Sequence, residues 1–219
     1  MMKSITQREI DIPNLYRIKK GDRAKLFAMY LRAFEEYPKL VGSFPKRETR
    51  LIALEATIRF YCTYDLHNGS SFSLDENIRE AVVIVHSDKM NYNLFRHILA
   101  GSYGKEYRRA MKRLSKKERQ VYVRLYQELD LLEEDIPIPM PHLYIDFLGT
   151  DPEYQGQGRG KKLMRQICEY ADSVRLPIML FTNTEADVKF YQGLGFHIIG
   201  VTSSETFGFV NTYLLYEPK

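Results

Sequence analysis

Three glycines at alternate positions, Gly156, Gly158 and Gly160, form the segment of this sequence with the clearest chemical signature. They follow an apolar run that is typical of a strand, and they precede a pattern that is typical of a helix. A glycine-rich turn at the start of a helix exposes backbone N–H groups, and such groups bind anions. Arg159 and Lys161 add positive charge to the same turn. These residues predict a phosphate-binding site.

Two familiar phosphate loops do not fit the spacing of this turn. The dinucleotide fingerprint G-x-G-x-x-G, started at Gly156, requires a glycine where the chain has Lys161. The P-loop requires a glycine five residues before Gly160 and a Ser or Thr after the lysine, where the chain has Gln155 and Lys162. The turn therefore belongs to another type of phosphate loop.

The elements around the turn are predicted to run strand, helix, strand. We expect a strand over residues 142–149, a helix that ends near Ser173, and a buried strand over 178–181. Elements this close in sequence should form a parallel, right-handed crossover. Thr184 and Asp187 are spaced to cap a short helix that follows. Two further strands are expected to close the chain, over residues 196–203 and 209–216.

The first half of the chain is predicted to begin with a strand at residues 16–18 and a helix with Asp22 at its N-cap. A loop from Pro38 should separate this helix from a second one, over residues 48–64. Two strands of a meander should follow, over residues 70–74 and 79–86. Aromatic residues end the second helix, and they would either wall a small-molecule pocket or pack in the core: Phe60, Tyr61 and Tyr64.

Residues 89–135 read as a helical insertion, which a proline-rich connector over residues 136–141 ends. Ser115 and Glu118 form a capping box within it. Eight Lys and Arg residues between 105 and 119 precede an acidic block, and the two blocks would either pair or remain solvated. No groove-reading motif accompanies the basic block, so we expect no nucleic-acid partner.

Composition bounds the class of protein. With 219 residues, of which 44% are hydrophobic, the chain is long enough for one domain with its own core. No apolar run is long enough to cross a membrane and the N-terminus is polar, so we expect a cytoplasmic protein without a membrane partner. Cys62 and Cys168 lie in apolar helical patterns, where we expect reduced structural thiols and no metal site.

The segment Gln155-Gly156-Gln157-Gly158-Arg159-Gly160 resembles the Q/R-x-x-G-x-G/A signature of the GCN5-related N-acetyltransferase (GNAT) superfamily. Downstream, Phe190-Tyr191 and Gly195-Phe196 resemble the ending of the family's next helix. The match covers residues 142–216, and its subtype is similar to small-molecule enzymes such as puromycin N-acetyltransferase. The resemblance implies an α/β fold with a mixed central sheet flanked by helices, as a single domain over residues 1–219.

The resemblance also implies the cofactor, acetyl-CoA, and where it binds. The pyrophosphate would lie on the glycine turn, and the pantetheine arm would pair with the strand ahead of it. Asp187 stands where many family members have Asn, so Asn183 is an alternative for that contact. The implied cofactor-binding positions are Leu148, Gly149, Thr150, Gln155, Gly156, Gln157, Gly158, Arg159, Gly160, Lys161, Asn183, Asp187 and Tyr191.

Three positions carry the chemistry that the resemblance implies. A backbone N–H near Leu148 would stabilise the oxyanion, and Tyr191 would protonate the departing thiolate. Asp146 is the first candidate for a general base, because alternation along the strand would place it on the same face as Leu148. A structural role for this carboxylate remains an alternative, and His142 and His86 are weaker candidates.

The function expected from these residues is transfer of an acetyl group from acetyl-CoA to a primary amine of a small molecule in a ternary complex. One alternative is a protein acetyltransferase that acts on an N-terminus or a lysine. Another is a CoA-binding regulatory module without catalysis, because a fold does not determine a function. Both a monomer and a homodimer agree with the sequence.

Overall fold

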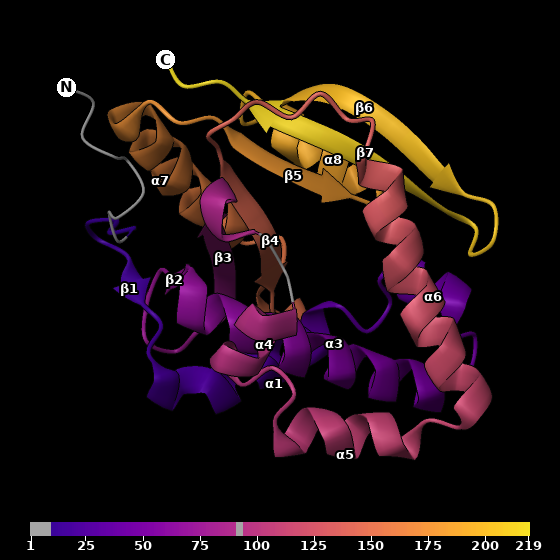
Figure 1. Ribbon diagram of the computed structural model, residues 1–219. Helices are drawn as coiled ribbons and strands as arrows, with labels where there is room; N and C mark the ends of the chain where they lie inside the picture. The colour runs from indigo at the N-terminus through magenta and orange to yellow at the C-terminus, as the bar shows by residue number, and fades with distance from the viewer. Residues whose placement is uncertain (1–9, 91–93) are drawn as a thin grey trace.

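The computed structural model describes residues 10–90 and 94–219. Residues 1–9 of the predicted domain and residues 91–93 of the predicted insertion lie outside these ranges. The described strands form one mixed sheet in the order β1-β2-β3-β4-β5-β7-β6 (Figure 1). They are β1 (Tyr16–Arg17), β2 (Ser70–Ser73), β3 (Glu80–His86), β4 (Leu143–Thr150), β5 (Ile178–Thr182), β6 (His197–Ser204) and β7 (Phe209–Tyr216).

Within this sheet, β4 and β5 pair in parallel, as the strand, helix, strand order predicts. The other neighbouring pairs are antiparallel. The helix α7 (Arg159–Val174) makes the crossover between β4 and β5. Its buried residues lie at helical spacing on the side that faces the sheet: Leu163, Met164, Ile167, Cys168 and Ala171. The mixed α/β class and the flanking helices are therefore confirmed.

Helices cover both faces of the sheet (Figure 1). Side chains of α1 (Arg23–Ala33) and α3 (Arg47–Asn68) share one apolar cluster with one face of β3. Side chains of α7 and α8 (Glu185–Gln192) share a second cluster with the opposite face. The free thiols of Cys62 and Cys168 are buried in these two clusters, one in each.

The segment after α1 differs from the prediction of a plain loop. It contains a short helix, α2 (Pro38–Ser43), with Pro38 at its start. Proline fits this position because the first N–H groups of a helix have no partner within the helix. The prediction ended the first helix at this proline, whereas the proline opens a new turn of helix over the sheet.

The predicted insertion is helical in its described part. It comprises α4 (Leu94–Ala100), α5 (Lys105–Arg113) and α6 (Lys116–Glu133), and it joins β3 to β4. The capping box of Ser115 and Glu118 is present at the start of α6. Charges of α5 pair with α3, because Arg113 contacts Glu55 and Glu106 contacts Arg59. The insertion is thus tied to the main body of the fold.

Two searches concern the described residues only. None of their helices is long and apolar enough to cross a membrane. They also contain no group of three or more His, Cys, Asp or Glu residues placed to hold a metal ion.

Candidate active site

The strands β4 and β5 separate soon after they pair. Their ladder consists of Leu143 with Ile178 and Tyr144 with Met179, and no described strand pairs with this edge of β4 beyond Tyr144. A cavity of about 990 Å³ lies along the opening. Its wall reaches from the glycine turn at one end to α6 at the other. Unpaired backbone, a glycine turn and a cavity therefore meet at one place.

The glycine turn has the geometry of an anion cradle. Gly156 and Gly158 have φ angles of +74° and +73°, which side chains other than glycine rarely tolerate. Gly158 is the N-cap of α7 and has no side chain to cap it, and the helix's hydrogen bonding begins with Lys162 N–H donating to Gly158 O. The N–H groups of the first turn are therefore available to a ligand.

Close packing fixes this turn against β4 and α1. A Cβ on Gly160 would lie 3.3 Å from Thr150 Oγ1, so glycine lets α7 approach the end of β4. A Cβ on Gly149 would lie 3.1 Å from the Tyr30 ring and 3.3 Å from the Phe34 ring. The end of β4 is thereby held between two helices, with its edge toward the cavity.

Arg159 differs from the expectation that its side chain adds charge to the phosphate site. Its guanidinium donates to the carboxylates of Glu80 and Asp75, at 2.7 Å in the Asp75 pair. Glu80 is fully buried, and it also accepts from Ser73 Oγ and Leu74 N–H. The charge of Arg159 is therefore neutralised by residues near the β2–β3 turn, although the residue still lines the cavity.

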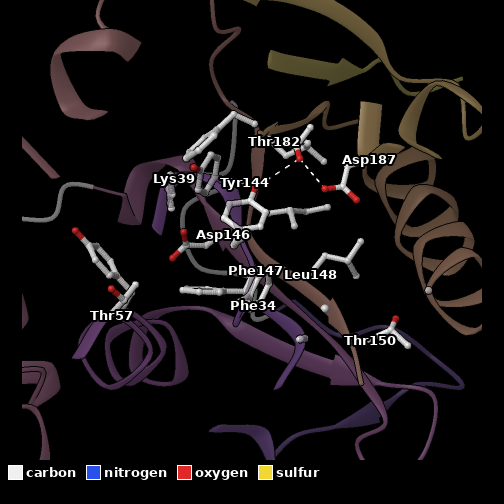
Figure 2. Close-up of a pocket in the computed structure, with 18 of the residues that line it drawn as sticks. Phe34, Lys39, Thr57, Tyr144, Asp146, Phe147, Leu148, Thr150, Thr182 and Asp187 are labelled. Carbon is white, nitrogen blue, oxygen red and sulfur yellow. Dashed lines mark hydrogen bonds between the residues drawn. The ribbon is translucent and has the colours of Figure 1, made fainter. Parts of the chain in front are cut away.

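The predicted alternation along β4 is wrong at Asp146. Val83 faces Phe147 and the next residue, Ile84, faces Ile145, so Asp146 is an extra residue in a β-bulge. Beyond the bulge, Phe147 packs against the cluster under α1 and α3, and Leu148 packs against the cluster under α7. Figure 2 shows Asp146 and Leu148 on opposite sides of the strand. Both nevertheless line the cavity.

Asp146 belongs to a buried group of ionisable side chains. Burial raises the pKa of Asp146 and raises the pKa of Asp65 well above its usual range. Asp65 on α3 is fully buried, and the charge of Asp146 and a hydrogen bond with that carboxyl raise the pKa of Asp65 further. The nearby cation is Lys39, which favours the ionised form of Asp146. Asp65 is thus the carboxyl that holds its proton more strongly, and its hydrogen bond favours the ionised form of Asp146.

Tyr191 lies at the opposite side of the opening, on α8. It is 7% exposed, and burial raises its pKa well above the usual value, so the phenol carries its proton at neutral pH. One turn earlier, Asp187 Oδ2 accepts from Thr182 Oγ1 at 2.9 Å (Figure 2). Thr184 caps α8 by accepting from Asp187 N–H, which confirms half of the predicted capping box.

Four of the predicted residues are not part of the cavity wall. Asn183 donates its side-chain N–H groups to Val210 O and Asn211 Oδ1, both at 2.7 Å, which ties it to β7. Among the described residues, the cavity wall includes neither Asn183 nor Gln157. It includes neither His86 nor His142, whose Nδ1 lies 2.8 Å from Pro139 O.

The other end of the cavity is formed largely by residues that the sequence did not single out. Phe60 and Tyr61 of α3 line this end, as the pocket-wall alternative predicted. Tyr64 is buried in the core and donates to Lys89 O. Tyr126, Asp130 and Glu133 of the insertion line the same end, together with Lys39. Burial raises the pKa of Glu133 to about 7. Tyr126, Asp130 and Glu133 are spaced at i, i+4 and i+7, and this spacing could have shown from the sequence that they share one face of a helix.

Comparison with known proteins gives the family. Residues 122–196 match the model of the acetyltransferase (GNAT) family. A stretch of 54 residues, 25% of this chain, is 32% identical to the N-alpha-acetyltransferase RimI of Mycobacterium tuberculosis. This match spans 34%, about a third, of the length of that curated relative.

Solved structures give the same fold. A structure of histone acetyltransferase HPA2 and related acetyltransferase from Corynebacterium glutamicum is similar, with a TM-score of 0.57 and 15% identity. The similarity covers 95% of this chain and 98% of that one. An agmatine N-acetyltransferase also gives a TM-score of 0.57 at 15% identity, over 94% of this chain and 100% of that one.

A mixed sheet that opens between parallel β4 and β5, with a glycine turn at the opening, defines an acyltransferase-type fold. Together with the sequence match over residues 122–196, this fold places that part of the chain in the GNAT superfamily. The finer likeness to the puromycin type stays a prediction.

Proposed function

We propose that this protein is an N-acetyltransferase that moves an acetyl group from acetyl-CoA to the primary amine of a small molecule. The observation that carries the proposal is the continuity of the cavity. At one end lie the uncapped start of α7 and the unpaired edge of β4, and at the other lie aromatic rings and carboxyl groups. An anionic thioester and a cationic amine can thus bind at opposite ends of one space.

The chain's residues fit acetyl-CoA at the first end. The backbone of residues 155–161 offers N–H groups and two left-handed glycines to the pyrophosphate. Residues 148–150 offer an unpaired strand edge to the pantetheine arm, which carries amide groups of its own. Lys161 supplies the side-chain charge at this end in place of Arg159.

The proposed chemistry divides between two sides of β4. Asp146 takes a proton from the acceptor amine, which makes the nitrogen a nucleophile. A backbone N–H near Leu148 stabilises the negative charge that develops on the carbonyl oxygen. Tyr191 donates its proton to the thiolate that leaves. Direct transfer in a ternary complex requires only these groups, and no metal.

A small-molecule acceptor is favoured by the way α6 walls the far end of the cavity. Tyr126 and Phe60 give that wall an apolar surface, and Asp130 and Glu133 give it carboxyl groups that can accept hydrogen bonds from an amine. A partly apolar amine matches both. The match to RimI, whose name describes an N-alpha-acetyltransferase, supports the second candidate, a protein amine. A panel of small amines and of peptides with free N-termini or lysines separates these two candidates from each other.

Release of free thiol from acetyl-CoA is the readout for that panel. Turnover with small amines supports the first candidate, and turnover with peptides alone supports the second. Binding of acetyl-CoA without thiol release from any amine favours a regulatory module. We also propose a single domain over residues 1–219 and a cytoplasmic location. The protein is proposed to be a monomer or a homodimer, and light scattering of the purified protein distinguishes these two states.

The cofactor site itself is tested by the substitution Gly158→Trp. Acetyl-CoA at millimolar concentration should raise the melting temperature of the unmodified protein, because a ligand that binds the folded state stabilises it. The indole ring would fill the turn, so this shift should disappear in Gly158→Trp. Calorimetric titration of acetyl-CoA should show the same loss.

Gly208→Trp is the matched control. Gly208 also has a positive φ, +67°, and a Cβ there would have no heavy atom within 4 Å. It lies in the β6–β7 turn, away from the cavity wall, so the same bulk and the same backbone strain should leave the shift intact. An equal shift in Gly158→Trp and in the unmodified protein would place the phosphate site elsewhere.

A further inference from the structure

Lys39 is an amine that the chain itself places inside the proposed acceptor end. It lies in the first turn of α2 and lines the cavity. Its Nζ lies 5.2 Å from the centre of the Phe181 ring, 5.8 Å from Tyr37 and 5.9 Å from Tyr126. These rings come from β5, from the residue before α2, and from α6. The aromatic faces hold the ammonium by cation–π attraction.

No carboxylate forms an ion pair with Lys39 among the ion pairs of the described residues. Asp146 is close enough to influence its charge without such a pair, and Figure 2 shows the two side chains on the same side of β4. Lys39 is therefore held mainly by rings, which attract the ammonium yet also pack against a neutral amine.

Burial lowers the pKa of Lys39 to about 8, and the charge of Asp146 opposes this shift only in part. At pH 7 about a tenth of the Lys39 side chains are neutral, compared with less than about one in a thousand for an ordinary lysine. Only the neutral amine has a lone pair that can attack a carbonyl carbon. Lys39 is thus far richer in the reactive form than a lysine in water.

The position of Lys39 relative to the strand opening matters as much as its charge. Met179 is the last residue of β5 that pairs with β4, and Phe181, the ring nearest to Nζ, lies two residues beyond it. Asp146 lies two residues beyond Tyr144, the last paired residue on β4. Nζ is therefore held over the opening, beside Asp146. In the proposed function, Asp146 takes the proton from the acceptor amine.

We propose that Lys39 is a site of self-acetylation: when no acceptor amine fills the cavity, the protein transfers the acetyl group of its bound thioester to Lys39 Nζ. This inference rests on the proposed acetyltransferase function. The Nζ lone pair forms the new C–N bond, and the C–S bond of the thioester breaks. The nitrogen loses its proton to Asp146, and the departing thiolate takes one from Tyr191, so that acetyl-lysine and free CoA thiol are the products.

Acetylation of Lys39 would change the acceptor end in two ways. It would remove the positive charge that favours the ionised form of Asp146, and it would add an acetyl group to a cavity that the acceptor must share. Both changes oppose transfer to an external amine. Acetylation of Lys39 is therefore expected to lower the rate at which the protein acetylates external amines.

The test uses the purified full chain, acetyl-CoA and no added amine. Intact-mass measurement and peptide mapping should find one acetyl group, on Lys39, that accumulates at least about ten times faster than on exposed lysines, in line with the larger neutral fraction. Lys39→Arg should abolish this product, because arginine keeps the charge and cannot be acetylated here. Lys112→Arg, at an exposed position on α5, should leave it unchanged.

Two further measurements make the outcome decisive. Gly158→Trp should remove the Lys39 label, because the thioester must be bound, while slow chemical labelling of exposed lysines continues. Equal acetyl labelling of Lys39→Arg and of the unmodified protein would contradict the inference. Turnover of small amines by a protein whose Lys39 stays unlabelled would also contradict it, but the proposed function would then stand. Failure to bind acetyl-CoA at all would overturn the proposed function and this inference with it.

Discussion

At the scale of single residues, the site depends on ionisable groups that have little water around them. Asp65, Asp146 and Lys39 influence one another's charge across the space between α3, β4 and α2. A buried carboxylate is costly, above all beside a second carboxylate, so the deepest carboxyl holds a proton. The fold in this way places the carboxyl group of Asp146 at the cavity, beside the amine of Lys39.

Asp65 should make the protein less stable as the pH rises. Its pKa is raised in the folded state, so the folded protein binds a proton that the unfolded chain releases above about pH 4. Stability is therefore lost with increasing pH, by up to about 1.4 kcal/mol per pH unit. Asp65→Asn cannot ionise and should remove this slope, so its stability advantage over the unmodified protein should grow from pH 4 upward.

Urea denaturation at several pH values measures this effect. Asp135→Asn, at an exposed position after α6, is the control and should leave the pH dependence unchanged. Parallel stability curves for Asp65→Asn and the unmodified protein would mean that Asp65 is ionised in the folded state.

At the scale of elements, the start of α7 is held by an ion-paired anchor. Arg159 joins the first turn of this helix to Asp75 and Glu80 on either side of the β2–β3 turn, 84 and 79 residues away in sequence. The anchor leaves the backbone of the glycine turn facing the cavity. The bulge at Asp146 acts on β4 in a comparable way, because it turns one carboxylate toward α3 and leaves Leu148 on the other face.

Loss of this anchor should destabilise the protein strongly. Arg159→Ala would leave the fully buried Glu80 without its cation, and removing one partner of a buried pair costs about 3–5 kcal/mol. The double variant Arg159→Ala/Glu80→Gln has no buried charge and should recover most of this loss. Urea denaturation of the two single variants and the double variant measures the coupling.

Arg165→Ala is the matched control for that cycle, because Arg165 is exposed on the same helix. We expect it to change stability by less than about 0.5 kcal/mol. A comparably small loss in Arg159→Ala would contradict the anchor role and would return the Arg159 side chain to consideration as a phosphate ligand.

At the scale of the whole molecule, the insertion is part of the core. Ala110 of α5 and Leu125 of α6 are buried in the same cluster as Leu54 of α3 and Val83 of β3. The far end of the cavity is therefore made by side chains that also hold the domain together. This arrangement links the acceptor end to global stability.

The protein should accordingly unfold in one cooperative transition. Scanning calorimetry should give equal calorimetric and van't Hoff enthalpies, because the core clusters span the insertion and the sheet. Saturation with acetyl-CoA should move the single peak upward, by about 2.7 kcal/mol of stability at 100 times the dissociation constant. A separate early transition would show that the insertion unfolds by itself.

Much of this architecture could be predicted from local patterns. The periodicity that predicted a strand at 178–181 and a helix that ends near Ser173 is a property of neighbouring residues, and both predictions were correct. The α2 helix was missed because its sequence carries no clear period. The bulge at Asp146 was missed because it depends on how β4 aligns with β3, which no single strand records.

The sequence by itself determined the mixed α/β class, the place of the glycine turn at the start of α7, and the resemblance of residues 142–216 to the GNAT superfamily, because these follow from residue types at short spacings. Only the tertiary structure decided that Arg159 pairs with Glu80 and Asp75, and that Asp146 faces Lys39 and Asp65. These contacts join residues tens of positions apart, so their energies depend on the burial that folding creates.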